Sequence, residues 1–147
     1  MLEIREITEC KENYIFLLII GDEQEDMIDR YLQRSRLFIG YIDGTPCACC
    51  AVTIERDGIV EIKNLAVLPQ FRMRGIGRSM LQHVENIIPS GIYQLGTGET
   101  PATLHFYKRC GYAYHHRIPD FFTDNYDHPI IEEGIRLKDM VYLRKTN

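Results

Sequence analysis

The sequence predicts one α/β domain with a mixed, mostly antiparallel central sheet of about seven strands and helices on both faces. Three observations carry this prediction. The length of 147 residues is typical of one domain. The pairs Asp43-Gly44 and Asp57-Gly58 each separate two apolar runs, which indicates hairpins. From Ile76 onward, apolar residues recur at the period of a helix instead of a strand. We therefore expect a single domain over residues 1–147.

The elements of the first half follow from the spacing of apolar residues. A short strand is expected over residues 2–7, followed by two helices that are joined near Gly21-Asp22. The apolar residues with helical spacing are Tyr14, Leu17, Leu18, Met27, Ile28, Tyr31 and Leu32. Three strands are then expected over residues 37–42, 47–54 and 59–67, and the Asp-Gly turns between them predict an antiparallel meander.

The second half begins with an amphipathic helix, which Pro89 and Gly91 are expected to end. Its core face is expected to contain Ile76, Met80, Leu81, Val84, Ile87 and Ile88. A short strand over residues 92–95, a helix over residues 103–109 and two strands around residues 112–117 and 140–143 complete the order.

Two glycines and one loop of the second half need separate comment. Gly96 and Gly98 are expected to break the strand that begins at residue 92. The loop over residues 119–129 contains several aromatic and acidic residues. It is either a packed hairpin or self-association surface, or the lining of a site for a cation, and the sequence alone leaves both interpretations open.

The charge balance narrows the class of partner. The formal net charge is -4, and no basic tail or stripe is present, so a nucleic-acid partner is not expected. The longest apolar run, residues 15–20, is too short to span a membrane, and the charged N-terminal residues do not resemble a signal peptide. A cytoplasmic location is expected.

The cysteines and histidines do not show the spacing of a metal site. Cys47, Cys49 and Cys50 lie among small apolar residues, as buried cysteines of a strand do. His105 and the pair at positions 115 and 116 show no metal-ligand pattern. We expect no bound metal and a reducing compartment.

The residues that open the long helix form a candidate anion site. Arg72-x-x-Gly75-x-Gly77 contains two glycines, which permit a tight turn and let a bulky anion approach the backbone. The first N–H groups of a helix and the positive end of its dipole bind anions, and Arg74 and Arg78 add positive charge. This combination suits a pyrophosphate. A turn that binds no ligand is the alternative. A Rossmann dinucleotide-binding motif is not expected, because its third glycine is missing.

A second motif, Phe106-Tyr107-x-x-x-Gly111-Tyr112, follows at a distance of about thirty residues. Together, the two motifs in this order resemble the GNAT superfamily of N-acetyltransferases. Residues 65–77 are similar to its coenzyme A motif, and residues 106–112 are similar to its later Leu-Tyr-x-x-x-Gly-Phe signature. The close match covers a minority of the chain, although the order of elements fits throughout.

The resemblance implies acetyl-coenzyme A as the cosubstrate and assigns roles to individual residues. Tyr107 matches the tyrosine that protonates the departing thiolate, and Glu61 matches the general base of the histone-modifying branch. The residues implied in coenzyme binding lie on the third meander strand and at the start of the long helix. They are Leu65, Ala66, Val67, Arg72, Met73, Arg74, Gly75, Ile76, Gly77 and Arg78. The chain departs from many relatives after the fifth strand, where they have an asparagine and this chain has Gly96-Thr97-Gly98.

The expected reaction is transfer of an acetyl group to a primary amine. Such an amine has a pKa of about 10.4, so a base must remove its proton before it attacks. Acidic residues over positions 22–29 and 120–127 favour a small or peptide-borne cationic amine as the acceptor. The alternatives are a non-catalytic coenzyme A-binding sensor or interaction module, and an α/β interaction domain without coenzyme. A homodimer is one state that the sequence leaves open.

Overall fold

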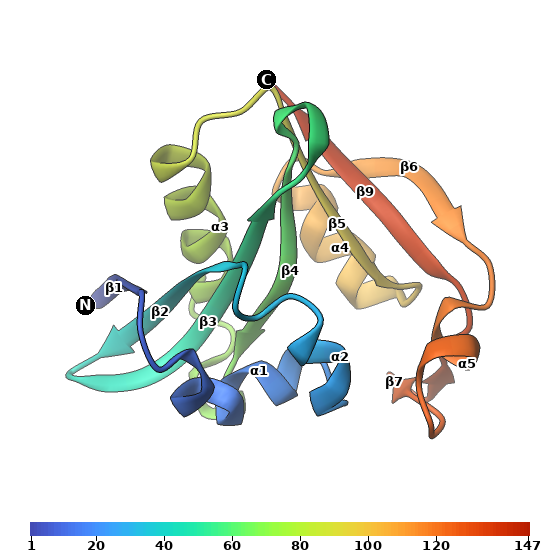
Figure 1. Ribbon diagram of the computed structural model, residues 1–147, viewed down its shortest axis with the longest axis horizontal. Coiled ribbons are helices and arrows are strands. Elements are labelled where there is room, and N and C mark those ends of the chain that lie inside the picture. Colours follow the sequence, from blue (N-terminus) through green and yellow to red (C-terminus); the bar gives the residue numbers. More distant parts are fainter. The chain divides into compact units, whose positions relative to one another are not determined.

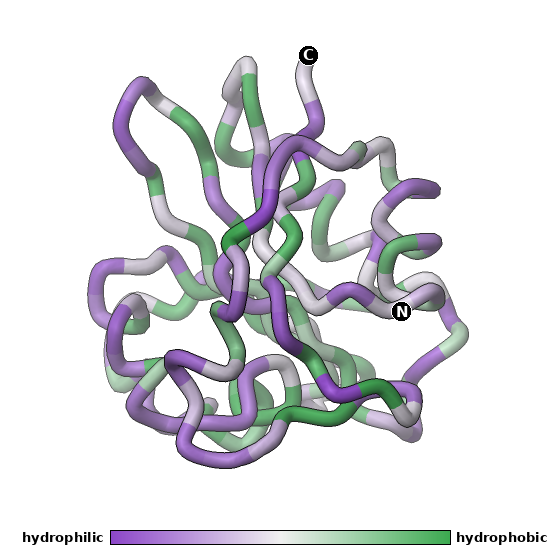
Figure 2. The backbone as a smooth tube through the Cα atoms, turned by 90° about the vertical axis from the view of Figure 1, so that its right-hand side faces the viewer, coloured by the Kyte–Doolittle hydropathy of each residue, from purple (hydrophilic) through white to green (hydrophobic).

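The computed structural model describes all 147 residues, which form two compact units, Met1–Ser90 and Gly91–Asn147. Each unit is described by itself below (Figure 1). Hydrophobic and hydrophilic stretches alternate along the backbone (Figure 2), and no helix is both long and apolar enough to cross a membrane. The extent of a single domain over residues 1–147 stays a prediction.

The first unit contains a four-stranded antiparallel sheet in which each strand pairs with the next one along the chain. Its strands are β1 (Leu2–Ile7), β2 (Arg36–Ile42), β3 (Thr45–Ile54) and β4 (Val60–Val67). Asp43 and Gly44 have φ angles of 49° and 78°, and Asp57 and Gly58 have φ angles of 64° and 74°. Two consecutive residues with positive φ are the backbone of a tight hairpin turn, so the predicted meander is confirmed.

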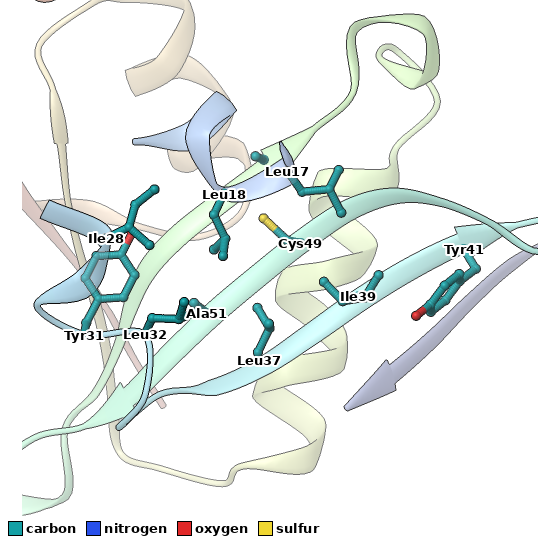
Figure 3. Close-up of a cluster of buried hydrophobic side chains, with 11 residues drawn as sticks. Leu17, Leu18, Ile28, Tyr31, Leu32, Leu37, Ile39, Tyr41, Cys49 and Ala51 are labelled. Carbon is teal, nitrogen blue, oxygen red and sulfur yellow. The ribbon is translucent and has the colours of Figure 1, made fainter. Parts of the chain in front are cut away.

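Helices cover both faces of this sheet. The 3-10 helix η1 (Lys11–Tyr14) leads into α1 (Ile15–Gly21) and α2 (Glu25–Asp29). Both α-helices contribute to an apolar cluster over one face (Figure 3). Its buried members are Leu17, Leu18, Ile28, Tyr31, Leu32, Leu37, Ile39, Tyr41, Cys49, Ala51 and Ala66.

The long helix α3 (Ile76–Ile87) lies on the opposite face. The neighbours of the cluster residues along β2 point to that side: the Phe38 ring contacts His83 at 5.6 Å, and Gly40 lies beneath the Met80 sulfur. Four of the six predicted core residues of α3 are buried within the helix, and Ile88 is buried just after it. The prediction was wrong for Ile87, which is 47% exposed because it lies in the last turn.

The second unit contains three antiparallel strands with β9 in the middle. They are β5 (Ile92–Gly98), β6 (Ala113–Ile118) and β9 (Met140–Thr146), and α4 (Pro101–Arg109) connects the first two. Between β6 and β9 lie the short helix α5 (Phe121–Asn125) and a hairpin of β7 (Ile131–Glu132) and β8 (Ile135–Arg136). The seven long strands of the two units agree with the predicted α/β class.

The structure corrects the predicted end of β5. Gly96 and Gly98 do not break the strand but continue it, paired with Tyr142 and Met140 of β9. A side chain at Gly96 would overlap Met140, and one at Gly98 would overlap Leu137. Close packing therefore explains these glycines, and a turn does not.

The aromatic segment between β6 and β9 has a small core of its own. Phe122, Ile130 and Leu137 are buried together, and Phe121, Tyr126 and Met140 pack around them. The rings of Phe122 and Tyr126 stack at 5.5 Å. Of the two interpretations that the sequence left open, this packing favours the packed hairpin.

Candidate active site

The first unit contains a sharp turn between β4 and α3. The N–H of Leu68 donates to the carbonyl of Cys47 at 2.8 Å, and the 3-10 helix η3 (Pro69–Phe71) follows. The chain then passes through two residues in the left-handed region, Met73 with φ 64° and Gly75 with φ 74°. A glycine adopts this conformation at little cost, which explains why Gly75 directly precedes the helix.

The N-terminus of α3 is open to a ligand. Gly75 is its N-cap, so no side chain caps the helix, and the first N–H groups have no acceptor within it. A Cβ atom added at Gly75 would meet no protein atom within 4 Å, and the Met73 side chain is fully exposed. Because the helix is twelve residues long and its first turn is accessible, this turn can accommodate a bulky anion such as a pyrophosphate.

Arginine side chains hold the turn and make it positive. Arg72 donates from Nε to the carbonyl of Val67 at 3.2 Å, and Arg74 donates to the carbonyl of Gln70 at 3.4 Å. The guanidinium of Arg74 also lies 5.2 Å from the centre of the Phe71 ring. Arg78 lies exposed in the first turn of α3. The three cations therefore lie in and beside the open helix end, where their charges favour an anion.

Strand β4 carries three of the residues that the family resemblance relates to coenzyme binding. Leu65, Ala66 and Val67 pair with Cys50, Cys49 and Ala48 of β3. The register shifts so that Asn64 faces Ala51 and Ile62 faces Val52, which leaves Lys63 as an extra residue in β4. Such a bulge bends a strand and redirects its side chains, and bulges are frequent beside active sites.

Glu61 lies on the same strand, upstream of the bulge. The residue is only 5% exposed, and its carboxylate forms an ion pair with the ammonium group of Lys63. The ion pair with Lys63 agrees with a structural role for Glu61 as an alternative to a catalytic one, and the residue does not lie at a solvated surface position. A carboxylate that forms an ion pair can still act as a base through a water molecule.

A buried polar chain links β4 to the turn between α1 and α2, and none of its members was predicted from the sequence as a functional residue. Asn64 donates from Nδ2 to the carbonyl of Leu18 at 2.8 Å and to the Tyr31 hydroxyl at 3.1 Å. The Tyr31 hydroxyl donates to Oδ2 of Asp22 at 3.3 Å. Burial, followed by the Asp22 charge, raises the pKa of Tyr31 above its ordinary value. The one signal in the sequence is a polar asparagine directly before the apolar run Leu65–Val67.

The cysteines of β3 are fully buried, as the sequence predicted. Burial raises the pKa of Cys49 to about 12 and also raises the pKa of Cys50. Because only a thiolate is a good nucleophile, these thiols are inert near neutral pH. The structure contains no group of three or more His, Cys, Asp or Glu residues that could hold a metal ion.

In the second unit, Tyr107 lies on the last turns of α4. Its ring packs edge-on against Phe106 at 5.0 Å and against the buried Tyr112 at 6.1 Å. Its carbonyl accepts the N–H groups of Cys110 and Tyr112, both at 3.0 Å, where Gly111 reverses the chain with φ 97°. The signature over residues 106–112 is therefore a rigid helix end that fixes the backbone of Tyr107.

The other end of α4 has a cap from a distant part of this unit. Glu133, in the turn between β7 and β8, accepts a hydrogen bond from the N–H of Ala102 at 3.2 Å. The Thr100 hydroxyl and the N–H groups of Ala102 and Thr103 lower the pKa of the Glu133 carboxyl. A carboxylate stabilises a helix N-terminus, so the hairpin and α4 support each other. No pattern in the sequence indicates this contact.

Comparison with known proteins identifies the family. The model of the acetyltransferase (GNAT) domain matches residues 33–114. The chain is 30% identical over 139 residues to the uncharacterized N-acetyltransferase YvbK of Bacillus subtilis (strain 168), and the match covers 92% of this chain and 90% of that protein.

Two similar solved structures extend the match to the whole fold. One is a GNAT family acetyltransferase from Elizabethkingia anophelis with acetyl-CoA bound, with 28% identity, a TM-score of 0.92 and coverage of 99% of this chain and 98% of that chain. The other is the IAA acetyltransferase from Bacillus cereus ATCC 14579, with 28% identity, a TM-score of 0.93 and complete coverage of both chains. These matches favour an enzyme over a non-catalytic coenzyme A-binding module. The chain therefore belongs to the GNAT family of acetyltransferases, and it is an acetyl-coenzyme A-dependent N-acetyltransferase.

Proposed function

We propose that the acceptor is a primary amine on a small or peptide-borne cation. The observation that carries this proposal is the acidic turn between α1 and α2, which packs against the strand that carries Leu65–Val67 through Asn64 and Ala66. The carboxylates of this region are Asp22, Glu23, Glu25, Asp26 and Asp29. A negative surface raises the local concentration of a cation and steers it to the site.

Coenzyme binding is proposed to use the backbone more than side chains. The pyrophosphate would lie on the N–H groups at the start of α3, from Met73 to Arg78, with Arg72 and Arg74 nearby. The backbone of Leu65, Ala66 and Val67 would pair with the pantetheine arm as an added strand does. This arrangement explains the exposed N-terminus of α3 and the open space over Gly75.

The chemical step moves one acetyl group and one proton. The amine nitrogen attacks the acetyl carbonyl carbon, an N–C bond forms, the C–S bond breaks, and coenzyme A leaves as a thiolate. We assign Tyr107 as the acid that protonates this thiolate, on its match to the family tyrosine. A thiol of this kind has a pKa of about 8.5, so it departs fairly well unaided and the acid assists.

Glu61 is proposed as the base that takes the proton of the amine. Four residues separate it from Leu65, which corresponds to about 13 Å along an ideal strand. The bulge at Lys63 shortens this separation. Over such a distance we propose that the proton passes through water to the carboxylate.

A screen of amines tests the proposed acceptor. The purified protein is mixed with acetyl-coenzyme A and individual primary amines of matched size that differ in a second group, which is cationic, neutral or anionic. Release of free thiol measures turnover. The proposal predicts the highest kcat/KM for amines with a second cationic group and a loss of this preference as salt rises. Preference for neutral or anionic amines would contradict it.

The homodimer and the cytoplasmic location stay predictions.

A further inference from the structure

The turn that follows α1 lies directly over Leu65–Val67, the segment proposed to pair with the pantetheine arm. Asp22 is the C-cap of α1, and its N–H donates to the carbonyl of Leu18 at 2.9 Å. The preceding residue, Gly21, packs so closely on β4 that a Cβ atom there would lie 3.3 Å from the Cβ of Ala66. Consecutive Cα atoms are about 3.8 Å apart. Asp22 therefore directly follows a residue, Gly21, that packs against Ala66 in the middle of the segment Leu65–Val67.

The Asp22 carboxylate is held by side chains that are nearly inaccessible to water. Tyr31 is 6% exposed and Asn64 is 4% exposed. The amide group of Asn64 can only donate from Nδ2, so the Tyr31 oxygen accepts that bond and directs its own proton to Asp22. The chain of hydrogen bonds therefore has one direction, from β4 to the carboxylate, and it fixes where Oδ2 lies.

The hydrogen-bonded residues Asn64, Tyr31 and Asp22 lie next to apolar side chains, so their polar groups need an explanation. Figure 3 shows Tyr31 beside Ile28, Leu32 and Leu18, within the apolar cluster that covers this face of the sheet. Apolar side chains of similar volume stabilise such a core equally well or better. The polar chain ends on a half-buried carboxylate, which has two oxygens and room for several hydrogen bonds. Its effect is to present a negative charge in a fixed place.

The aspartates of the neighbouring helix α2 lack that support. The carboxylate of Asp26 accepts a hydrogen bond from Gln24 at 2.6 Å, and both Asp26 and Asp29 are exposed. Neither has a hydrogen bond to β4 among the contacts of Asn64 and Tyr31. Asp22 thus differs from its acidic neighbours by its link to the strand that carries the reaction.

We propose that Asp22 binds the cationic group of the acceptor amine, and that Tyr31 and Asn64 are positioning residues that hold its carboxylate. This inference rests on the proposed function, because it gives the cation preference a specific residue. An ammonium group offers three donors to a carboxylate that already receives a hydrogen bond from Tyr31, and such charge-assisted bonds are stronger than neutral ones.

The test compares Asp22→Asn with Asp29→Asn, which removes the same charge from the same region, in steady-state kinetics with the best amine of the screen. We expect Asp22→Asn to raise the KM for the amine by about tenfold or more, the loss of one charge-assisted hydrogen bond. Asp29→Asn should change it by less than about threefold. The KM for acetyl-coenzyme A should stay the same in both. Tyr31→Phe keeps the charge of Asp22, so it should raise the KM for the amine by a smaller factor than Asp22→Asn does.

Each outcome decides the inference. Equal effects of Asp22→Asn and Asp29→Asn, or no effect of either, would overturn it, because general steering or no steering would then suffice. A rise in the KM for acetyl-coenzyme A in Asp22→Asn would also overturn it. If the wild-type protein prefers neutral or anionic amines, the proposed function fails, but Asp22 is still tested with the preferred amine, since the primary amine itself is a cation at neutral pH.

Discussion

The side-chain amide of Asn64 fills the space in which a side chain at Gly21 would lie, so that a Cβ atom at Gly21 would overlap Asn64 Oδ1. The same amide donates to the carbonyl of Leu18, three residues before the glycine. Glycine at position 21 and asparagine at position 64 therefore form one contact between α1 and β4. Neither φ nor a turn explains this glycine, because its φ is not in the left-handed region.

This contact predicts a strong coupling between two substitutions. Gly21→Ala should lower the free energy of unfolding by about 1–3 kcal/mol through overpacking. In the background of Asn64→Ala, which removes the overlapping oxygen, the same substitution should cost less, with a coupling of about 0.5–3 kcal/mol. Urea denaturation of the four proteins measures this cycle. Additive costs would show that Asn64 does not occupy the space beside Gly21.

Tyr107→Phe tests the proposed acid. The substitution removes only the hydroxyl, so the ring contacts with Phe106 and Tyr112 remain. We expect kcat to fall by up to about 100-fold while the affinity for acetyl-coenzyme A stays nearly the same. Tyr114→Phe, which changes an exposed tyrosine of the same unit, is the matched control. Full activity of Tyr107→Phe, when chemistry limits the rate, would return this residue to a purely structural role.

Glu61→Gln tests the proposed base. Turnover should fall by at least about tenfold at neutral pH. Part of it should return at higher pH, because more of the amine, with its pKa of about 10.4, is then unprotonated. Lys63→Met removes the ion pair but keeps the carboxylate, so it should retain most of the turnover. A pH–rate profile of Glu61→Gln that matches the wild type, or equal losses in both variants, would exclude the base role.

Glu133 predicts an acid-sensitive contact within the second unit. Its carboxyl pKa is lowered in the folded state, first by the Thr100 hydroxyl and then by N–H groups of α4. The cap is therefore fully present above the ordinary pKa of a glutamate, about 4.3. It is lost as the pH falls from there through the lower folded value.

Hydrogen exchange checks this contact. The amides of Ala102 and Thr103 should exchange faster in Glu133→Gln than in the wild type at neutral pH, because the charged acceptor at the helix N-terminus is gone. Glu132→Gln, which neutralises the adjacent residue of the same hairpin, is the control. Unchanged exchange at both amides would show that the hairpin does not support α4.

The sequence predicted the fold well where local patterns decide it. The two Asp-Gly turns, the meander and α3 follow from turn chemistry and from apolar periodicity, and all are present. The prediction failed at Gly96 and Gly98, because these glycines leave space for side chains from β9 and from the segment before it. No local pattern in the sequence shows a packing partner about forty residues away. The short elements α5, β7 and β8 were missed because each is too short to show a period.

The residues of the candidate site also fall into those that local sequence patterns predicted and those that they did not. The turn at Gly75 and the arginines were visible, because an anion site at a helix N-terminus depends on neighbouring residues. Asn64, Tyr31 and Asp22 were not visible as a group, since they come from three elements and meet only in the folded protein. Glu133 was missed for the same reason.

We propose that the open N-terminus of α3 holds the pyrophosphate of acetyl-coenzyme A, and two glycine variants test this binding mode. Gly75 and Gly58 both have a φ of 74° and no protein atom within 4 Å of an added Cβ. Gly75→Val and Gly58→Val therefore introduce the same backbone strain and no clash with the protein. Only the first one places a side chain where the ligand would lie.

The free energy of unfolding of the wild type and of both variants is measured with and without acetyl-coenzyme A. At about 100 times the dissociation constant, the ligand should stabilise the wild type and Gly58→Val by about 2.7 kcal/mol. Gly75→Val should lose most of this gain. Equal stabilisation of both variants, or no stabilisation of the wild type, would contradict the claim that coenzyme binds at this turn.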